Sequence, residues 1–325
     1  MTRPLPASPG DRMHASALRL ADEMTRRAAE IGVEIQTLAN GARLIDAGVA
    51  ATGSHEAGRL YAEACMGGLG QVAVGVRRLG PATLAEARVT VDAPLHACMA
   101  SQYAGWKIQV QKFFAMGSGP ARSLAAAEPF FAQHPPQSRS DSAVLLLETS
   151  TLPGAEVADF VAARCGIEPA RLTLIAASTG SLAGCTQIAA RSVETALHKL
   201  MELGFDLTAI VAGAGACPIA PGIPDPLRAI GRTNDAVLYG AAVSLWVRAD
   251  DRAIEAVIDR LPASSSKDHG RLFYDLFKEH GDFYKIDPLL FSPAQVTLVN
   301  AASGRVWSAG AIDEAMLRKS FGIDG

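Results

Sequence analysis

Four functional side chains share one side of a predicted helix over residues 182–203. They are Gln187, Arg191, Glu194 and His198. At 100° per residue they fall within an arc of about 60°, opposite the apolar face of the helix. Arg191 and Glu194 are neighbours on that arc, and a carboxylate beside a guanidinium is suited to moving protons. Periodicity alone favours another interpretation, an ordinary solvated face with one surface ion pair.

A second candidate site is the turn from Ser178 to Ser181, which follows a predicted buried strand and precedes this helix. Ligands of open α/β sheets collect beyond the carboxyl ends of strands, and free N–H groups at a helix start attract anions. The turn therefore predicts a site for a phosphate or carboxylate, with hydroxyl groups from Ser178, Thr179 and Ser181. In the alternative interpretation, Thr179 or Ser181 only caps the helix.

Three glycine-rich stretches, at residues 67–70, 117–120 and 213–218, match no nucleotide-binding motif. In the third, Pro218 and Pro221 occur where a dinucleotide fingerprint would open a helix. No GxxxxGK[ST] or GxSxG sequence occurs either. The sequence disfavours nicotinamide and Walker-type nucleotide binding, and we expect these stretches to be turns or places of close backbone approach.

The five cysteines lie 20 or more residues apart, and none forms a CxxC pair or has a nearby histidine at zinc spacing. We expect them to be reduced and mostly buried, with no structural metal. A metal site that the fold assembles from distant residues stays open, because spacing tests only local pairs.

The chain has 325 residues, of which 49% are hydrophobic, and a net charge of −3. This composition indicates a folded globular protein, and the lack of a basic block argues against nucleic acid as a partner. The apolar runs are too short to span a membrane, and residues 1–14 contain no apolar core of a signal peptide. We therefore expect a cytoplasmic protein without membrane contact, with a frayed start over residues 1–14.

Predicted strands and helices alternate along the chain, which indicates the α/β class. Strands are expected at residues 71–79, 87–91, 106–115, 143–148, 172–177, 208–212 and 237–247, with hairpins at 33–47, turning at Asn40-Gly41 in a type I′ turn, and at 294–309. Helices are expected at residues 55–65, 154–165, 182–203, 250–260 and 268–279. The polar stretch at 134–141 predicts a linker, which would divide the chain into domains 1–140 and 141–325.

Three separated blocks of sequence resemble one known family. They are ASQYAGW at residues 100–106, STGSLAGCTQIAARSVETALHKL at residues 178–200, and GRTNDAVLYG at residues 231–240. Together they resemble methenyltetrahydromethanopterin cyclohydrolase, and the likeness extends over nearly the whole chain after the first dozen residues. Three blocks in order are far more specific than any single short motif.

The resemblance implies reversible hydrolysis of the methenyl group on a pterin carrier to a formyl group, without a metal or bound cofactor. It implies two α/β domains with helices packed on mixed sheets, the substrate pocket between them, and a homotrimer. By motif, the catalytic pair of the family matches Arg191 and Glu194. We expect Glu194 to act as general base and acid and Arg191 to orient it and keep it ionised.

Other polar residues at the two candidate sites and within the resembling blocks offer donors and acceptors to a pterin or to an acidic tail of its carrier. The predicted substrate-binding residues are Ser101, Gln102, Ser178, Thr179, Ser181, Gln187, His198, Arg232, Thr233, Asn234 and Asp235. For residues 232–235 an ordinary loop is the alternative, since Asn and Asp are common in turns. Tyr103 and Trp106 fit a core position as well as a stacking partner.

Two other classes of function stay open. A different α/β enzyme that acts on a phosphorylated metabolite would use the turn at residues 178–181 as its anion site. A non-catalytic pterin-binding protein would bind the carrier without turnover. A changed R-x-x-E pair would have been a sign of the second class, but the pair is intact.

Overall fold

Two mixed β-sheets of six strands each form the framework of the computed structural model, which describes residues 8–136, 139–281 and 285–323. The order in the first sheet is β1-β2-β8-β7-β6-β5, with β2, β8 and β7 parallel and the other neighbours antiparallel. Its strands are β1 (Glu34–Thr37), β2 (Arg43–Asp46), β5 (Trp106–Val110), β6 (Phe113–Ser118), β7 (Ala143–Glu148) and β8 (Leu172–Ala177).

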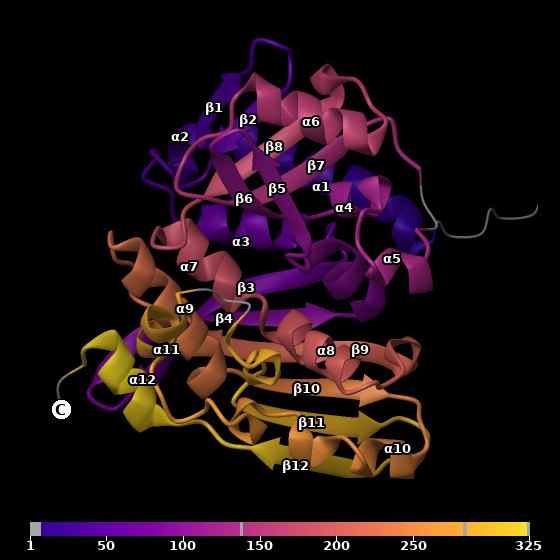
Figure 1. Ribbon diagram of the computed structural model, residues 1–325, viewed down its shortest axis with the longest axis vertical. Coiled ribbons are helices and arrows are strands. Elements are labelled where there is room, and N and C mark those ends of the chain that lie inside the picture. The colour runs from indigo at the N-terminus through magenta and orange to yellow at the C-terminus, as the bar shows by residue number, and fades with distance from the viewer. Residues whose placement is uncertain (1–7, 137–138, 282–284, 324–325) are drawn as a thin grey trace, which may run out of the picture.

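The second sheet has the order β12-β11-β10-β9-β4-β3, in which only β10 and β11 are parallel neighbours. Its strands are β3 (Gly70–Leu79), β4 (Ala82–Val91), β9 (Ile210–Pro218), β10 (Ala242–Val247), β11 (Gln295–Asn300) and β12 (Val306–Gly310). Figure 1 shows the first sheet in the upper part of the molecule and the second in the lower part. The expected α/β class, with helices on mixed sheets, is confirmed.

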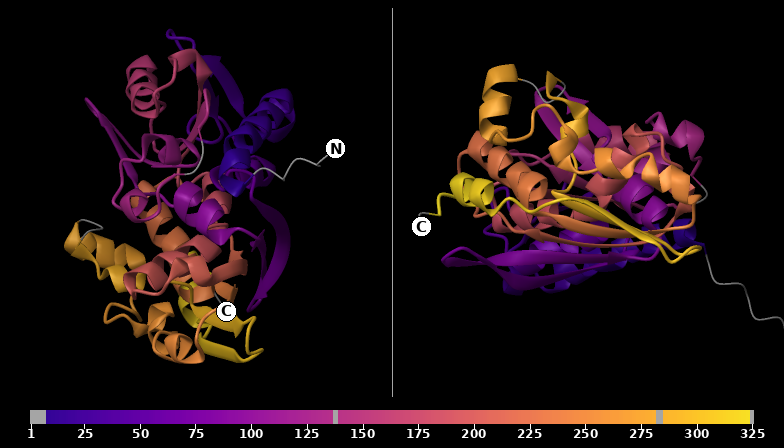
Figure 2. Two further views of the ribbon diagram at one scale, coloured as in Figure 1. Left: turned by 90° about the vertical axis from the view of Figure 1, so that its right-hand side faces the viewer. Right: turned by 90° about the horizontal axis from the view of Figure 1, so that it is seen from below.

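Helices pack on both faces of the first sheet, α1 and α3 on one and α4 and α6 on the other, while α7, α8 and α9 pack on the second sheet. In Figure 2 the orange helices of the C-terminal part lie on one side of the orange and yellow strands. The α-helices are α1 (Pro9–Arg26), α2 (Ala28–Ile31), α3 (His55–Cys65), α4 (Ala121–Ala125), α5 (Phe130–Gln133), α6 (Ala155–Cys165), α7 (Leu182–Ala189), α8 (Ser192–Glu202), α9 (Pro226–Gly240), α10 (Asp251–Glu255), α11 (Phe273–His280) and α12 (Glu314–Phe321). A π-helical segment, η1 (Leu95–Gln102), and the 3₁₀ turns η2 (Pro169–Arg171), η3 (Leu207–Ala209), η4 (Ile258–Arg260), η5 (Ala263–Ser265) and η7 (Pro288–Leu290) complete the elements.

The two central strands β7 and β8 place polar residues at one edge of the first sheet. They pair in parallel and are buried almost throughout, as their continuous apolar sequences require. Glu148, the last residue of β7, lies opposite Ala177, the last residue of β8. The turn that starts at Ser178 therefore begins beside Glu148.

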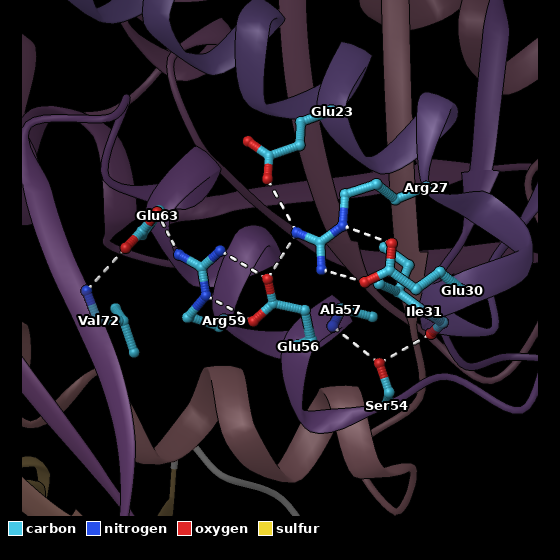
Figure 3. Close-up of polar contacts among 10 residues, drawn as sticks. All are labelled: Glu23, Arg27, Glu30, Ile31, Ser54, Glu56, Ala57, Arg59, Glu63 and Val72. Atoms are coloured by element: carbon cyan, nitrogen blue, oxygen red, sulfur yellow. Dashed lines mark hydrogen bonds and ion pairs between the residues drawn. The ribbon is translucent and has the colours of Figure 1, made fainter.

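Helix α3 lies between the sheets and contributes apolar residues to the cores on both sides. Its start is capped by Ser54, whose hydroxyl accepts from the N–H of Ala57 at 3.0 Å. Figure 3 shows how side chains on α3 reach its neighbours: Glu56 pairs with Arg27 at 2.8 Å, and Glu63 accepts from the N–H of Val72 in β3 at 2.9 Å. Ion pairs at the surface, such as Glu56–Arg27, contribute only a few tenths of a kcal/mol each, so burial of the apolar α3 side chains dominates this junction.

The predicted long helix at residues 182–203 is two helices, α7 and α8, which is a correction. At Ala190 and Arg191 ψ is 0° and 3°, far from the helical value, and the N–H of Arg191 donates to Ile188 three residues back. The side chain of Gln102 donates to the carbonyl of Ala190 at 3.2 Å. A tertiary contact therefore satisfies a carbonyl that the interrupted helix leaves free.

Other predicted boundaries were wrong in part. Residues 106–115 are the β5–β6 hairpin rather than one strand, residues 237–240 end α9 rather than start a strand, and residues 213–218 are strand β9 rather than a turn. Close backbone approach at the last stretch is confirmed, since a Cβ at Gly213 would lie 2.7 Å from a methyl group of Val193. Helix α1 occupies residues 9–14 of the expected frayed start, whereas residues 1–7 lie outside the described part.

The remaining expectations differ less. The 33–47 hairpin is confirmed, but its turn is not type I′, because only Gly41 of the Asn40-Gly41 pair has a positive φ. The expected helix at 268–279 begins later, at Phe273, and the one at 250–260 is divided into α10 and η4. The other predicted strands and helices are confirmed, although β4 begins earlier than expected, at Ala82, and β9 extends further, to Pro218.

Each sheet takes strands from both sides of residue 140, the predicted domain boundary. β3 and β4 precede this residue but belong to the second sheet, and β7 and β8 follow it but belong to the first. The boundary therefore does not coincide with the division between the sheets. In the described ranges, no helix combines the length and hydrophobicity needed to cross a membrane.

Candidate active site

Arg191 lies at the break between α7 and α8, and its guanidinium donates in three directions. Nη1 donates to the carbonyl of Gln102 at 2.7 Å, Nη2 to the hydroxyl of Ser118 at 3.0 Å, and Nε to the side-chain carbonyl of Gln187 at 3.1 Å. The residue is only 8% exposed. A solvated helix face is therefore excluded for Arg191, and its planar fork is held rigidly.

Glu194 lies one turn further along α8, and it is only 7% exposed. Its Oε2 is 3.8 Å from Nη1 of Arg191, an ion-pair distance that is longer than a hydrogen bond. Burial raises the pKa of Glu194, while Arg191, His198 and Arg122 act against this rise. The expectation that Arg191 keeps the carboxyl fully in its ionised range is thus only partly met, and a raised pKa suits a group that both takes and returns a proton.

The charges around Arg191 keep its guanidinium protonated. Burial by itself lowers the pKa of Arg191, but Cys65, Glu194 and Glu148 outweigh it, so the pKa lies above its ordinary value. Burial also raises the pKa of the Cys65 thiol, whose sulfur lies 3.6 Å from Nη2 of Arg191. All five cysteines are free and buried, as predicted.

The π-helical segment η1 ends at the two predicted binding residues Ser101 and Gln102. The Ser101 hydroxyl donates to the carbonyl of Cys65 at 2.7 Å, so this side chain is fully engaged inside the protein. Gln102 contacts Arg191 through its backbone carbonyl, and its side-chain oxygen is buried without a partner among the described residues. That oxygen is an acceptor available to a water or a substrate N–H. π-Helical turns of this kind are frequent at functional sites.

A buried ion pair holds the end of η1. Arg122 is completely buried and pairs with Glu128 at 2.5 Å, while its Nη1 donates to the carbonyls of Met99 and Ser101 at 2.9 and 3.0 Å. The guanidinium also lies 5.2 Å from the ring of Tyr103. Arg122 therefore fixes the backbone that accepts from Arg191, although nothing in its sequence context indicated this role.

His198 continues the row of Arg191 and Glu194 by one more turn. Its ring stacks on Tyr103 with centroids 5.1 Å apart, and its Nε2 lies 3.7 Å from the carboxylate of Glu202. Tyr103 therefore stacks on the imidazole ring of His198 and is not solely a core residue. His198 remains half-buried, at the edge of the same group of residues.

The turn from Ser178 to Ser181 joins this group through Glu148, which sequence analysis did not identify. Ser181 caps α7 by accepting from the N–H of Gly184, so the capping interpretation is confirmed for this residue. Thr179 donates to Oε1 of Glu148 at 2.7 Å. Ser178 donates to the carbonyl of Gly48 at 2.8 Å. An acid at the carboxyl end of a buried parallel strand was the available signal for Glu148.

The predicted binding residues Arg232 to Asp235 lie in helix α9, so the loop interpretation was wrong. Their side-chain hydrogen bonds hold α9 to its surroundings: Arg232 donates to the carbonyls of Pro221 and Ser320, and Thr233 and Asn234 donate to carbonyls one turn back. Asp235 accepts from the N–H of Phe273 at 2.9 Å and from the Ser320 hydroxyl at 2.6 Å. None of these bonds reaches Arg191 or Glu194, so binding by this set stays a prediction.

Asp235→Asn is expected to change how stability depends on pH. Burial raises the pKa of Asp235 to about 6, despite its hydrogen bonds from Ser320 and Phe273. Between the ordinary aspartate pKa of 3.8 and about 6, the folded protein therefore binds a proton that the unfolded chain has lost. The free energy of unfolding contributed by this group falls by about 3 kcal/mol as pH rises through that window, and the variant lacks this fall.

Urea unfolding of both proteins at pH 4 and pH 7 measures this effect. The stability of the wild type relative to Asp235→Asn is expected to be lower at pH 7 than at pH 4. Asp259→Asn is the matched control, because Asp259 is an exposed acid in η4 that does not contribute to the raised pKa of Asp235. An Asp235→Asn difference that is the same at both pH values would contradict the burial argument.

Two surface hollows lie away from the charged pair. One is on the second sheet between β4, β9, β10 and β11, and the other lies between η1, α5 and the start of α1. Arg191 and Glu194 line neither, so the predicted pocket between domains stays a prediction. Within the described part of the chain, no three His, Cys, Asp or Glu residues are grouped as they would be to hold a metal ion.

Comparison with known proteins identifies the family. The family model described as Cyclohydrolase (MCH) matches residues 13–321. The chain belongs to this family. A methenyltetrahydromethanopterin cyclohydrolase of Xanthobacter autotrophicus is 44% identical over 99% of this chain and 96% of its own length. Proteins with the same name from Rhodopirellula baltica and Methanoculleus marisnigri are 47% and 41% identical, over 87% and 94% of this chain and 87% and 98% of their own lengths.

Membership of the cyclohydrolase family bears out the resemblance drawn from the three sequence blocks. All three blocks lie inside the matched region. The structure adds that two of them meet, since Gln102 of the first block binds both Ala190 and Arg191 of the second. The third block forms most of α9.

Proposed function

We propose that the protein catalyses the reversible hydrolysis of N5,N10-methenyltetrahydromethanopterin to the N5-formyl form, in one-carbon metabolism. The observation that carries this proposal is the buried Arg191–Glu194 pair, whose arginine is fixed by three acceptors. An ordinary surface ion pair would not need an arginine held by three buried acceptors. The near full-length similarity to proteins named for this reaction supports the same substrate.

Glu194 acts as the proton carrier in this mechanism. The methenyl carbon lies between two nitrogens and carries positive charge, so water can attack it directly. Glu194 takes one proton from the attacking water, which leaves a neutral tetrahedral adduct. It then gives this proton to N10 as the C–N10 bond breaks, and takes the hydroxyl proton as the formyl C=O forms. One proton is finally released to solvent, which balances the conversion of a cation and water into a neutral product.

Arg191 orients this carboxylate and holds its charge. Its Nη1, which donates to the carbonyl of Gln102, also lies 3.8 Å from Oε2 of Glu194. We also propose that the side chains of Gln102, Thr179, Gln187 and His198 take part in substrate binding, because they surround the pair or connect to it. The carrier is the substrate here, and no bound cofactor is proposed. The homotrimer, the cytoplasmic location and the lack of a nucleic-acid or membrane partner stay predictions.

Ultraviolet absorbance of the methenyl chromophore tests the proposed function. Chelator-treated protein is expected to bleach methenyltetrahydromethanopterin rapidly and to leave methenyltetrahydrofolate at its uncatalysed rate. Failure to accelerate either reaction would overturn the catalytic claim. Tight binding of the carrier without turnover would then point to a pterin-binding protein, and tight binding of phosphate would point to an enzyme of phosphorylated metabolites.

A further inference from the structure

Glu148 is an acid without a cationic partner next to the candidate active site. It ends the buried strand β7 and is itself half-buried. Its Oε1 accepts from the Thr179 hydroxyl at 2.7 Å, and its Oε2 accepts from the side-chain amide of Gln187 at 3.4 Å. Both donors are neutral. In the part of the chain that the structure describes, no Lys, Arg or His nitrogen lies within ion-pair distance of this carboxylate.

One side chain separates Glu148 from Arg191. The amide of Gln187 donates to Glu148 and accepts from Nε of Arg191 at 3.1 Å, so it connects the two charged groups. The negative charge of Glu148 also contributes to the raised pKa of Arg191 and of Tyr61. Glu148 and Glu194 therefore both act electrostatically on the guanidinium of Arg191.

The other charged side chains of this region already have partners. Arg191 pairs with Glu194, and Arg122 pairs with Glu128. The nearby Arg232 is engaged by the backbone carbonyls of Pro221 and Ser320. Glu148 is thus left without a cation in contact with it, and a partly buried carboxylate that lacks a contacting counter-ion costs free energy. A cationic ligand would remove that cost.

We propose that Glu148 is a substrate-binding residue that supplies the counter-charge for the cationic methenyl form of the substrate. This inference rests on the proposed function. The methenyl form carries a positive charge delocalised over N5, the methenyl carbon and N10, whereas the formyl product is neutral there. Glu148 consequently strengthens binding of the substrate more than binding of the product. Selective affinity of this kind favours capture of the cation and release of the formyl product.

A merely structural role for Glu148 makes a different prediction. As a clamp between Thr179 and Gln187, Glu148 would hold the turn and the amide in place for any ligand. Its loss would then weaken binding of the cation and of the neutral product equally. The ratio of the two affinities, rather than either affinity alone, separates charge compensation from positioning.

The experiment measures dissociation constants of the methenyl cation and of the formyl product by ultraviolet titration. Glu194→Gln is the background, because slow turnover keeps both ligands intact during the titration. Adding Glu148→Gln is expected to weaken binding of the cation by about tenfold or more and binding of the product by less than about threefold. Adding Glu156→Gln, which removes an exposed acid on α6, is the matched control and is expected to change neither.

Glu148→Asp on the same Glu194→Gln background provides a second test. This test can be made even if the Glu148→Gln variant does not fold. Aspartate keeps the charge but shortens the side chain, so the contact with Thr179 is lost. The preference for the cation is expected to persist in this variant. Equal weakening of both ligands, or loss of the cation preference in Glu148→Asp, would overturn the proposal. Turnover by the wild type is measured first, so that failure of the proposed function is recognised separately from failure of the Glu148 role.

Discussion

Glu194→Gln is expected to lower kcat by about 10² to 10⁴, which is the contribution of a positioned general acid–base group. Glutamine keeps the shape of the side chain but neither accepts a proton from water nor returns one to the departing nitrogen. The 3.8 Å separation from Arg191 means that no direct hydrogen bond is lost with the charge. The buried Arg191 nevertheless loses its ion-pair partner, so thermal unfolding is measured beside kcat to establish that the variant is folded.

The matched control for this variant is Glu202→Gln. Glu202 is on the same helix, its side chain is 39% exposed, and it lies 3.7 Å from His198 rather than from Arg191. Initial rates of methenyl bleaching and titration of the substrate measure kcat and binding separately. A folded Glu194→Gln enzyme with near-normal kcat would remove Glu194 from the mechanism.

The pH profile provides an independent readout of the same group. Because burial raises the pKa of Glu194, the base form is lost at a pH above the ordinary glutamate value of 4.5. kcat/KM of the wild type is therefore expected to fall on its acid side as Glu194 becomes protonated. The residual activity of Glu194→Gln should lack that limb.

The pattern of residues 182–203 shows both the strength and the limit of sequence analysis. Its apolar positions predicted the buried face correctly, since Val193, Leu197 and Leu200 are completely buried. The break at Ala190 and Arg191 was invisible, because both residues are good helix formers and neither is Gly or Pro. The break is stabilised by two residues far away in the sequence: Gln102 donates to the freed carbonyl of Ala190, and Ser118 accepts from the guanidinium of Arg191.

Burial of the polar face of this helical segment could not be predicted from periodicity either, because it also depends on contacts from distant parts of the chain. Gln187, Arg191 and Glu194 have the composition of a solvated face, yet each is at least nine-tenths buried. They are covered by η1 and by the end of β6, elements whose approach only the fold determines. Helix geometry favoured a surface ion pair, which the burial of Arg191 and Glu194 contradicts, whereas the resemblance of the three blocks implied a catalytic pair, and that role stays a prediction.

Arg191→Lys is expected to lower kcat/KM by about 10² or more, although it keeps the positive charge. The three nitrogens of Arg191 bind acceptors from three different elements: Gln102 at the end of η1, Ser118 at the end of β6, and Gln187 on α7. A lysine ammonium is a single point and cannot span them. At least one buried acceptor would lose its partner, at a cost of about 1 to 3 kcal/mol each, and Glu194 would lose its fixed neighbour.

Arg27→Lys is the matched control, because Arg27 contacts three carboxylates but lies on the surface with its side chain 28% exposed. It is expected to leave kcat/KM unchanged, since exposed ion pairs contribute little. Steady-state kinetics and thermal unfolding of both variants separate loss of chemistry from loss of stability. Near-normal kcat/KM in Arg191→Lys, with the acid limb of its pH profile unshifted, would show that the positive charge alone suffices. Loss of activity with an unshifted limb would instead place the role of Arg191 in its geometry, as the anchored guanidinium indicates.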